Sequence, residues 1–105
     1  YGRMFFMHKN LGDKAVENPL YAPAIAVIQK LWDEIEQRLS NNVYLAGEQI
    51  TIADILVTVI ANWTPAMRKP INIGPKTKAM FASVIARPSY QKALAVENIT
   101  YKGAA

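Results

Sequence analysis

The sequence predicts an all-α fold, a bundle of about five helices in a single domain. Apolar residues recur at helical spacing in several segments, most regularly between residues 23 and 40. No segment carries a convincing strand pattern. The hydrophobic fraction of 51% in 105 residues excludes a disordered chain and suffices for one core.

Composition also excludes several classes of protein. No apolar run reaches the roughly eighteen residues of a membrane span, and the N-terminus does not resemble a signal peptide. The absence of cysteine removes disulfides, thiolate zinc sites and a catalytic thiol, and fits a reducing, cytoplasmic location. The net charge of +4 favours anionic partners, with one loose basic group at Arg68, Lys69, Lys76 and Lys78. No nucleic-acid motif accompanies it, so we expect neither nucleic-acid nor membrane partners.

The first two helices are predicted from the spacing of apolar residues and from residues that typically begin or end a helix. YGRMFFMHKN predicts the end of a helix that stops around Asn10–Gly12. Because the chain opens with Tyr1 rather than Met and is already helical, we expect an upstream part to be missing. After a polar linker, Pro23 suits the first turn of a long helix. Its apolar stripe comprises Ile28, Leu31, Trp32, Ile35 and Leu39.

Two further helices close the domain. GPKTKAMFASVIAR places Met80, Phe81, Val84 and Ile85 on one stripe and must end or kink near Arg87, because Pro88 follows. PSYQKALAVE predicts a short last helix. The helical domain is therefore expected over residues 1–97, with residues 98–105 as a loosely held tail.

The stretch QITIADILVTVIANW contains one acid, Asp54. ILVTVI alone could be a buried strand, but Thr51 and Asp54 have the spacing of an N-capping box, and Ile50 and Ile55 that of a hydrophobic staple. Residues 51–63 are thus predicted to form a helix, and their all-round apolar content predicts the most buried one. No further metal-ligating residues stand nearby, so Thr51 and Asp54 are interpreted as structural capping residues, with no metal site.

These elements together resemble a known family. YLAGEQ followed by ITIADI is similar to the C-terminal helical domain of the glutathione transferase superfamily, in which a capping box and staple open the central helix. The resemblance covers nearly the whole chain, from APAIAVIQKLWDEIEQRLS to RPSYQKAL. It implies glutathione as co-substrate, small apolar electrophiles, and an N-terminal thioredoxin-like domain that this chain lacks.

The pair His8–Lys9 has two interpretations. As residues alone, they form a helix C-terminal turn, where cations are favoured and no catalysis is implied. Their position before a polar loop, however, resembles the bacterial beta-class glutathione transferases. That resemblance implies that His8 and Lys9 face the glutathione site.

Trp63 also has two interpretations, core packing or a position near the site, the latter implied by its resemblance to the beta-class pattern. The remaining candidates could line a pocket for an apolar co-substrate, since methionine and aromatic side chains repack easily, or could belong to the core or a domain interface. These candidates are Tyr1, Met4, Phe5 and Met67.

For the intact protein, the resemblance implies attack of a glutathione thiolate on an electrophile, stabilised largely by the missing domain. The fragment alone should be inactive. The family also implies a homodimer formed through the first helix and the free face of the second. Two alternatives remain open: a non-catalytic interaction domain, and a sister enzyme such as an isomerase, dehalogenase or disulfide reductase.

Overall fold

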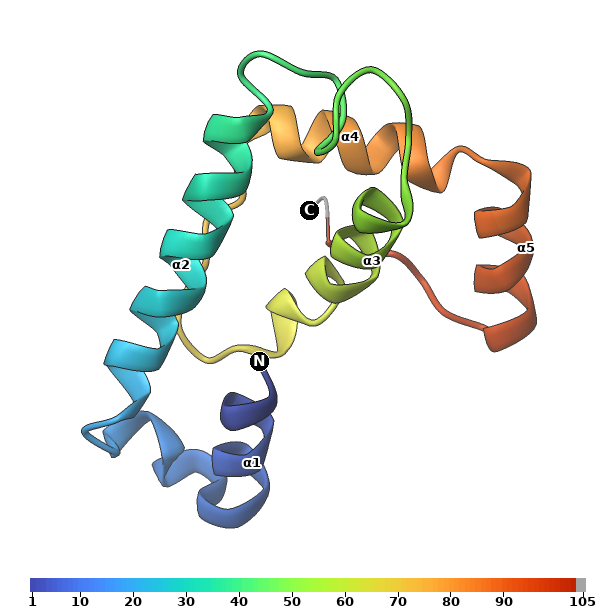
Figure 1. Cartoon of the computed structure of the whole chain (residues 1–105). Coiled ribbons are helices and arrows are strands. Elements are labelled where there is room, and N and C mark those ends of the chain that lie inside the picture. The colour runs from blue at the N-terminus through green and yellow to red at the C-terminus, as the bar shows by residue number, and fades with distance from the viewer. Residues whose placement is uncertain (104–105) are drawn as a thin grey trace.

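A computed structural model describes residues 1–103 and contains five α-helices and two short 3₁₀ helices (Figure 1). Within these residues there is no strand, only an isolated bridge between Tyr44 and Gly47, which confirms the all-α prediction. No helix in the described part is long and apolar enough to cross a membrane. The elements are α1 Gly2–Leu11, η1 Gly12–Glu17, α2 Tyr21–Arg38, α3 Ile52–Ala61, η2 Thr64–Ala66, α4 Pro75–Ile85 and α5 Pro88–Glu97.

The long helix α2 forms one side of the molecule (Figure 1). Helix α4 contacts α2, α3 and α5, while α1 and η1 pack near the N-terminal end of α2. The core lies between α2 and α4, where Trp32 meets Phe81 edge-on with ring centroids 6.0 Å apart. Met80 and Val84 add to it from α4, and Ile28 from α2.

Helix α1 ends where the sequence predicts. Gly12 has a φ of 56°, a left-handed conformation that suits glycine, and its N–H donates to the carbonyl of His8. The linker that follows is not irregular throughout, because its first part forms η1. The side chain of Asn18 then accepts the N–H of Leu20 at 2.9 Å just before α2 begins.

The start of α3 is organised by Asp54, whose side chain is fully buried. Its Oδ2 accepts the N–H of Thr51 at 2.8 Å, within a capping box. Its Oδ1 accepts the N–H of Leu45, also at 2.8 Å. The carboxylate therefore binds the helix start and the preceding loop at the same time.

The prediction that residues 51–63 form the most buried helix is wrong for this chain. α3 buries Asp54, Thr58 and Ala61, whereas Ile52 and Leu56 are 82% and 57% exposed. Ile52 and Leu56 lie on a side of α3 that faces solvent, and on the neighbouring side a groove of about 810 Å³, lined by Ala53 and Val57, separates α3 from α2. Apolar content all round a helix implies full burial only when neighbours surround it.

Helix α4 is capped from α2. The carboxylate of Glu36 accepts the backbone N–H groups of Lys76 and Thr77, at 2.9 and 2.8 Å, and the Thr77 hydroxyl at 2.6 Å. The first N–H groups of a helix have no partner within it, and an acid is favoured at that end. Glu36 thus performs for α4, from another helix, the function of a local N-cap.

The expectation of a loosely held tail at residues 98–105 is wrong for residues 99–103, which pack against the domain. The Tyr101 hydroxyl donates to the carbonyl of Thr58 at 2.9 Å, and its ring packs edge-on against Phe81 and Tyr90. Burial, followed by the proximity of Tyr90, raises the pKa of Tyr101 above its ordinary value, so the hydroxyl keeps its proton. The last part of the expected tail, residues 104–105, lies outside the described residues.

We expect Thr51→Ala to lower the free energy of unfolding by about 1 kcal/mol, the usual cost of losing an N-cap. Asp54→Ala should cost more, about 2–4 kcal/mol, because it leaves two partly buried N–H groups without their acceptor. Chemical denaturation of both variants, with Glu48→Ala from the same loop as control, measures this. Equal stability of Asp54→Ala and the control would contradict the assignment.

A second prediction concerns pH. Burial raises the pKa of Glu36, but hydrogen bonds from Thr77 and Lys76 and the Lys76 charge outweigh it, so the net shift is downward. A depressed carboxyl pKa stabilises the fold above the unfolded-state pKa, and this contribution is lost as pH falls through the folded-state pKa. Glu36→Gln should therefore cost about 1 kcal/mol near pH 7 and less near pH 3, whereas Glu34→Gln should cost little at either pH. A pH-independent cost would show that the charge is not involved.

Candidate functional site

An aromatic cluster lies where α1 meets the end of α3 and the start of α2. The ring centroids of Phe5 and Trp63 are 6.0 Å apart, and Tyr1 packs edge-on against Trp63 at 6.1 Å. Phe5 lies 6.4 Å from His8, which stacks on Tyr21 at 5.6 Å. These five residues are called the aromatic cluster below; four of them are site candidates from the sequence.

Helical spacing explains how α1 contributes three members. Tyr1, Phe5 and His8 follow one another at intervals of four and three residues and therefore share one face of the helix. Phe5 is 37% exposed, and Trp63, just beyond α3, is 45% exposed. The cluster thus presents an open aromatic surface rather than a closed core.

Tyr1 is fixed in this surface by hydrogen bonds to two other elements. The indole N–H of buried Trp32 donates to the Tyr1 hydroxyl at 2.8 Å. The same hydroxyl lies 2.6 Å from Oγ1 of Thr64 in η2. Tyr1 therefore joins α1 to α2 and η2, in addition to forming one edge of the cluster.

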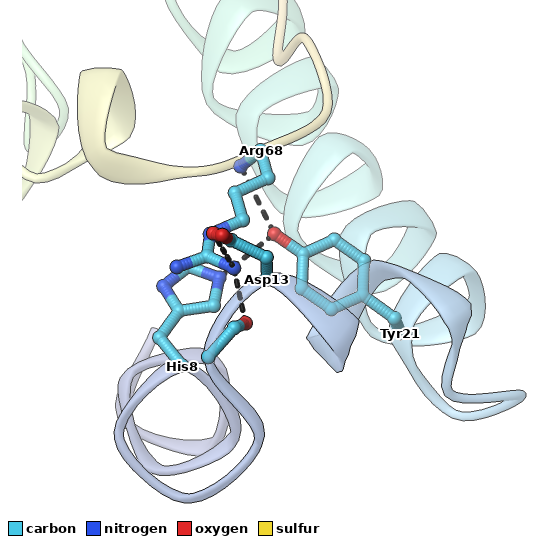
Figure 2. Close-up of polar contacts among 5 residues, drawn as sticks. His8, Asp13, Tyr21 and Arg68 are labelled. Carbon is cyan, nitrogen blue, oxygen red and sulfur yellow. Dashed lines mark hydrogen bonds and ion pairs between the residues drawn. The ribbon is translucent and has the colours of Figure 1, made fainter.

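His8 is held by Tyr21, as Figure 2 shows. The Tyr21 side chain is fully buried, and its hydroxyl oxygen accepts the backbone N–H of Arg68 at 2.9 Å. Nε2 of His8 lies 2.9 Å from the same hydroxyl. One buried oxygen thus connects α1, α2 and the loop after η2.

The hydrogen-bond partners of Tyr21 assign the tautomer of His8. Because the Tyr21 oxygen already accepts from Arg68, its own buried proton needs an acceptor, and Nε2 of His8 is the neighbour in reach. Nε2 is then the acceptor, and the proton of the neutral ring is on Nδ1. The ring can therefore offer an N–H donor from the side away from Tyr21.

The surroundings of His8 favour this neutral form. Burial and, to a smaller extent, the positive charge of Arg68 lower its pKa below the ordinary value of histidine. The guanidinium of Arg68 is held close by the carbonyl of Gly12 and by Asp13, 3.3 Å away (Figure 2). Asp13 is fully exposed, so the ion pair itself contributes little.

Of the remaining site residues predicted from the sequence, one lies on the surface and two lie in the core. Lys9 is exposed in the last turn of α1, beside His8. Met4 and Met67 are buried in the core, so in this chain they support the cluster rather than offer open pocket walls. No group of three or more His, Asp or Glu side chains able to hold a metal occurs among residues 1–103.

Two residues of this site are not among the site candidates that the sequence gives. Tyr21 bonds to His8 from 13 positions away, and the charge of Arg68 acts on His8 from 60 positions away. Neither residue stands in a recognisable motif. Asn18–Pro19 marks the turn before Tyr21, but it does not indicate that a tyrosine there would be buried against a histidine.

Comparisons with known proteins agree on one family. The sequence profile described as "Glutathione S-transferase, C-terminal domain" matches residues 1–88. Glutathione S-transferase 3 of Zea mays is 32% identical over 84 residues, which cover 70% of this chain and 38% of the maize protein. The chain therefore spans well under half the length of that relative. No solved structure matches the chain.

We expect the His8 imidazole to titrate below the ordinary pKa of histidine, and Arg68→Gln to raise that pKa because it removes the neighbouring charge. Since His8 is the sole histidine, its ring resonances in a ¹H NMR titration report it directly. Arg38→Gln, at the far end of α2, is the charge-matched control and should leave the pKa unchanged. An equal effect of both substitutions would show that Arg68 has no local influence.

Proposed function

The chain belongs to the glutathione S-transferase family as a C-terminal domain, and we propose that it is the helical half of an enzyme that conjugates glutathione to small apolar electrophiles. One observation carries the proposal beyond family membership. His8, Phe5 and Trp63, from two separate segments, form one continuous and partly exposed surface. An apolar surface with a single oriented polar group is typical of a small-molecule site.

In this proposal the catalytic work is divided between two domains. The resemblance assigns the main glutathione site and the group that activates its sulfur to an upstream thioredoxin-like domain. The fragment alone is therefore inactive. This chain contributes two things: a surface that binds the electrophile, and side chains that complete the glutathione site.

His8 and Lys9 are proposed to contact glutathione. With Nε2 engaged by Tyr21, the Nδ1–H of neutral His8 can donate to a sulfur or carboxylate of the tripeptide. Lys9, exposed next to it, supplies a positive charge for the same anion. Tyr21 and the backbone of Arg68 act as positioning groups, because they fix the ring orientation and tautomer.

The electrophile is proposed to bind on the remaining part of the aromatic cluster. Phe5 and Trp63 offer apolar ring area, and Tyr1 bounds it on one side. Met4 and Met67, in the core, would affect this surface indirectly through packing.

Finer assignments are also proposals. The resemblance of the His8–Lys9 pair and Trp63 to the beta-class pattern favours a bacterial beta-class enzyme, and we propose that it acts in detoxification in the cytoplasm. A homodimer would use the outer faces of α1 and α2, where Phe6, Val27 and Leu31 are exposed. The uncovered side of α3, with Ile52 and Leu56, would pack against the upstream domain, since most of the maize relative's length lies outside this chain.

The full-length protein tests this proposal in a glutathione conjugation assay with 1-chloro-2,4-dinitrobenzene and related electrophiles. His8→Ala should reduce kcat/KM roughly 10- to 100-fold, the effect of losing one site hydrogen bond. Phe5→Ala should raise KM for the electrophile. Leu11→Ala, an exposed apolar residue of α1 outside both the cluster and the proposed dimer face, is the control and should leave KM unchanged.

Unfolding curves of each variant separate a loss of chemistry from a loss of fold, which matters because His8 also binds Tyr21. His8→Gln, whose amide oxygen can still accept from Tyr21, serves as a second variant. Wild-type kinetics in every His8 variant would remove His8 from the site. A folded full-length protein without any conjugating activity would overturn the proposal in favour of an interaction domain or sister enzyme.

A further inference from the structure

A basic pocket of about 460 Å³ lies between the loop of residues 64–73, α4 and the C-terminal segment, and no residue of the aromatic cluster lines it. Four cationic side chains line it, from three separate parts of the chain. Arg68 and Lys69 come from the loop, Lys78 from α4, and Lys102 from the segment that packs back on α3. This convergence arises only on folding, because the cations are spread over 35 positions in sequence.

Three of the four cations of the pocket are not balanced by a carboxylate of the described residues. None of its lining residues is acidic. The ion pair found within 4.0 Å among residues 1–103 joins Arg68 to Asp13, so Lys69, Lys78 and Lys102 have no carboxylate partner in the described part. Lys69 and Lys78 are also half-buried. Cations held close together in a concave, partly desolvated site attract anions more strongly than the same charges on an open surface.

The rest of the lining is apolar and includes Met67, Ile71 and Ile73, with Thr64 and Asn72 as neutral polar groups. The volume lies within the range of small-molecule sites. Apolar walls next to several cations suit a ligand with an anionic head and a less polar body. Inorganic ions alone would leave the apolar part of the pocket unused.

We propose that this pocket binds a small organic anion with at least two negative charges, held by Lys69, Lys78 and Lys102. A phosphate monoester and a dicarboxylate share this chemistry. The site goes beyond the proposed glutathione function, because neither His8 nor Lys9 lines it. Arg68 contributes less than the three lysines, since its guanidinium is already engaged by Gly12 and Asp13.

Calorimetric titration of the whole chain with adenosine 5′-monophosphate, adenosine and adipate tests the proposal, at about 50 mM salt to limit screening. We expect saturable binding of the monophosphate and none of uncharged adenosine. Lys69→Gln/Lys78→Gln should weaken binding at least roughly tenfold, because it removes two charge-assisted contacts. Lys30→Gln/Lys92→Gln, exposed lysines outside the pocket, change the net charge equally and should alter affinity less than about twofold.

Each outcome of these titrations either supports or overturns the proposed anion site. Binding of adipate as well as the monophosphate supports a general dianion site, and binding of the monophosphate alone supports a phosphate site. Absence of saturable binding by both anions, equal affinity for adenosine, or equal weakening in both double variants would overturn the proposal. The amide NMR spectrum verifies folding, and Lys102→Gln, at an exposed position, replaces the double variant if that does not fold. The His8→Ala variant should retain this binding, so failure here is distinguishable from failure of the proposed enzyme function.

Discussion

The buried carboxylate of Asp54 is the interaction on which the arrangement of this domain depends. A carboxylate without water is stable only when surrounded by donors, and here the N–H groups of Leu45 and Thr51 provide them. The hydroxyl of Thr58 continues the connection by donating to the Asp54 carbonyl at 2.7 Å, and the Thr58 carbonyl accepts from Tyr101. The Asp54 side chain thereby orders the loop before α3 and the first turn of α3. Its backbone carbonyl and that of Thr58 connect α3 to the segment after α5.

The same helix positions the candidate site. Because α3 is fixed at its start by Asp54, its other end carries Trp63 to the face of α1, beside Phe5. Tyr1 and Tyr21 complete the attachment, each through a hydroxyl that bonds to two elements. The aromatic surface is therefore supported by polar contacts beneath it, so its exposed rings do not have to provide the stability of the fold.

The features that could be predicted from the sequence are those that local chemistry determines. The Thr51–Asp54 spacing and the Pro88 boundary involve neighbours within one turn, so the α-helices and the start of α3 could be inferred. The burial of α3 could not, since it depends on which elements lie around it. Helical spacing explains why Tyr1, Phe5 and His8 share one face. Nothing in the sequence indicated that Tyr21 bonds to His8 or that the charge of Arg68 acts on it, because both arise only in the folded chain. Met4 and Met67 show a related limit, because methionine patterns are the same in a pocket wall and in a core.

The cap that Glu36 provides for α4 also restricts which residues can occupy a position 38 residues away. Gly74 has an ordinary φ of −69°, so its backbone does not require glycine. A Cβ there would, however, lie 2.3 Å from Cδ of Glu36. The glutamate could move aside only by giving up its bonds to Lys76 and Thr77. Positions 36 and 74 are therefore epistatic: glycine is required only while the glutamate caps α4, and evolutionary exchange at one position is coupled to exchange at the other.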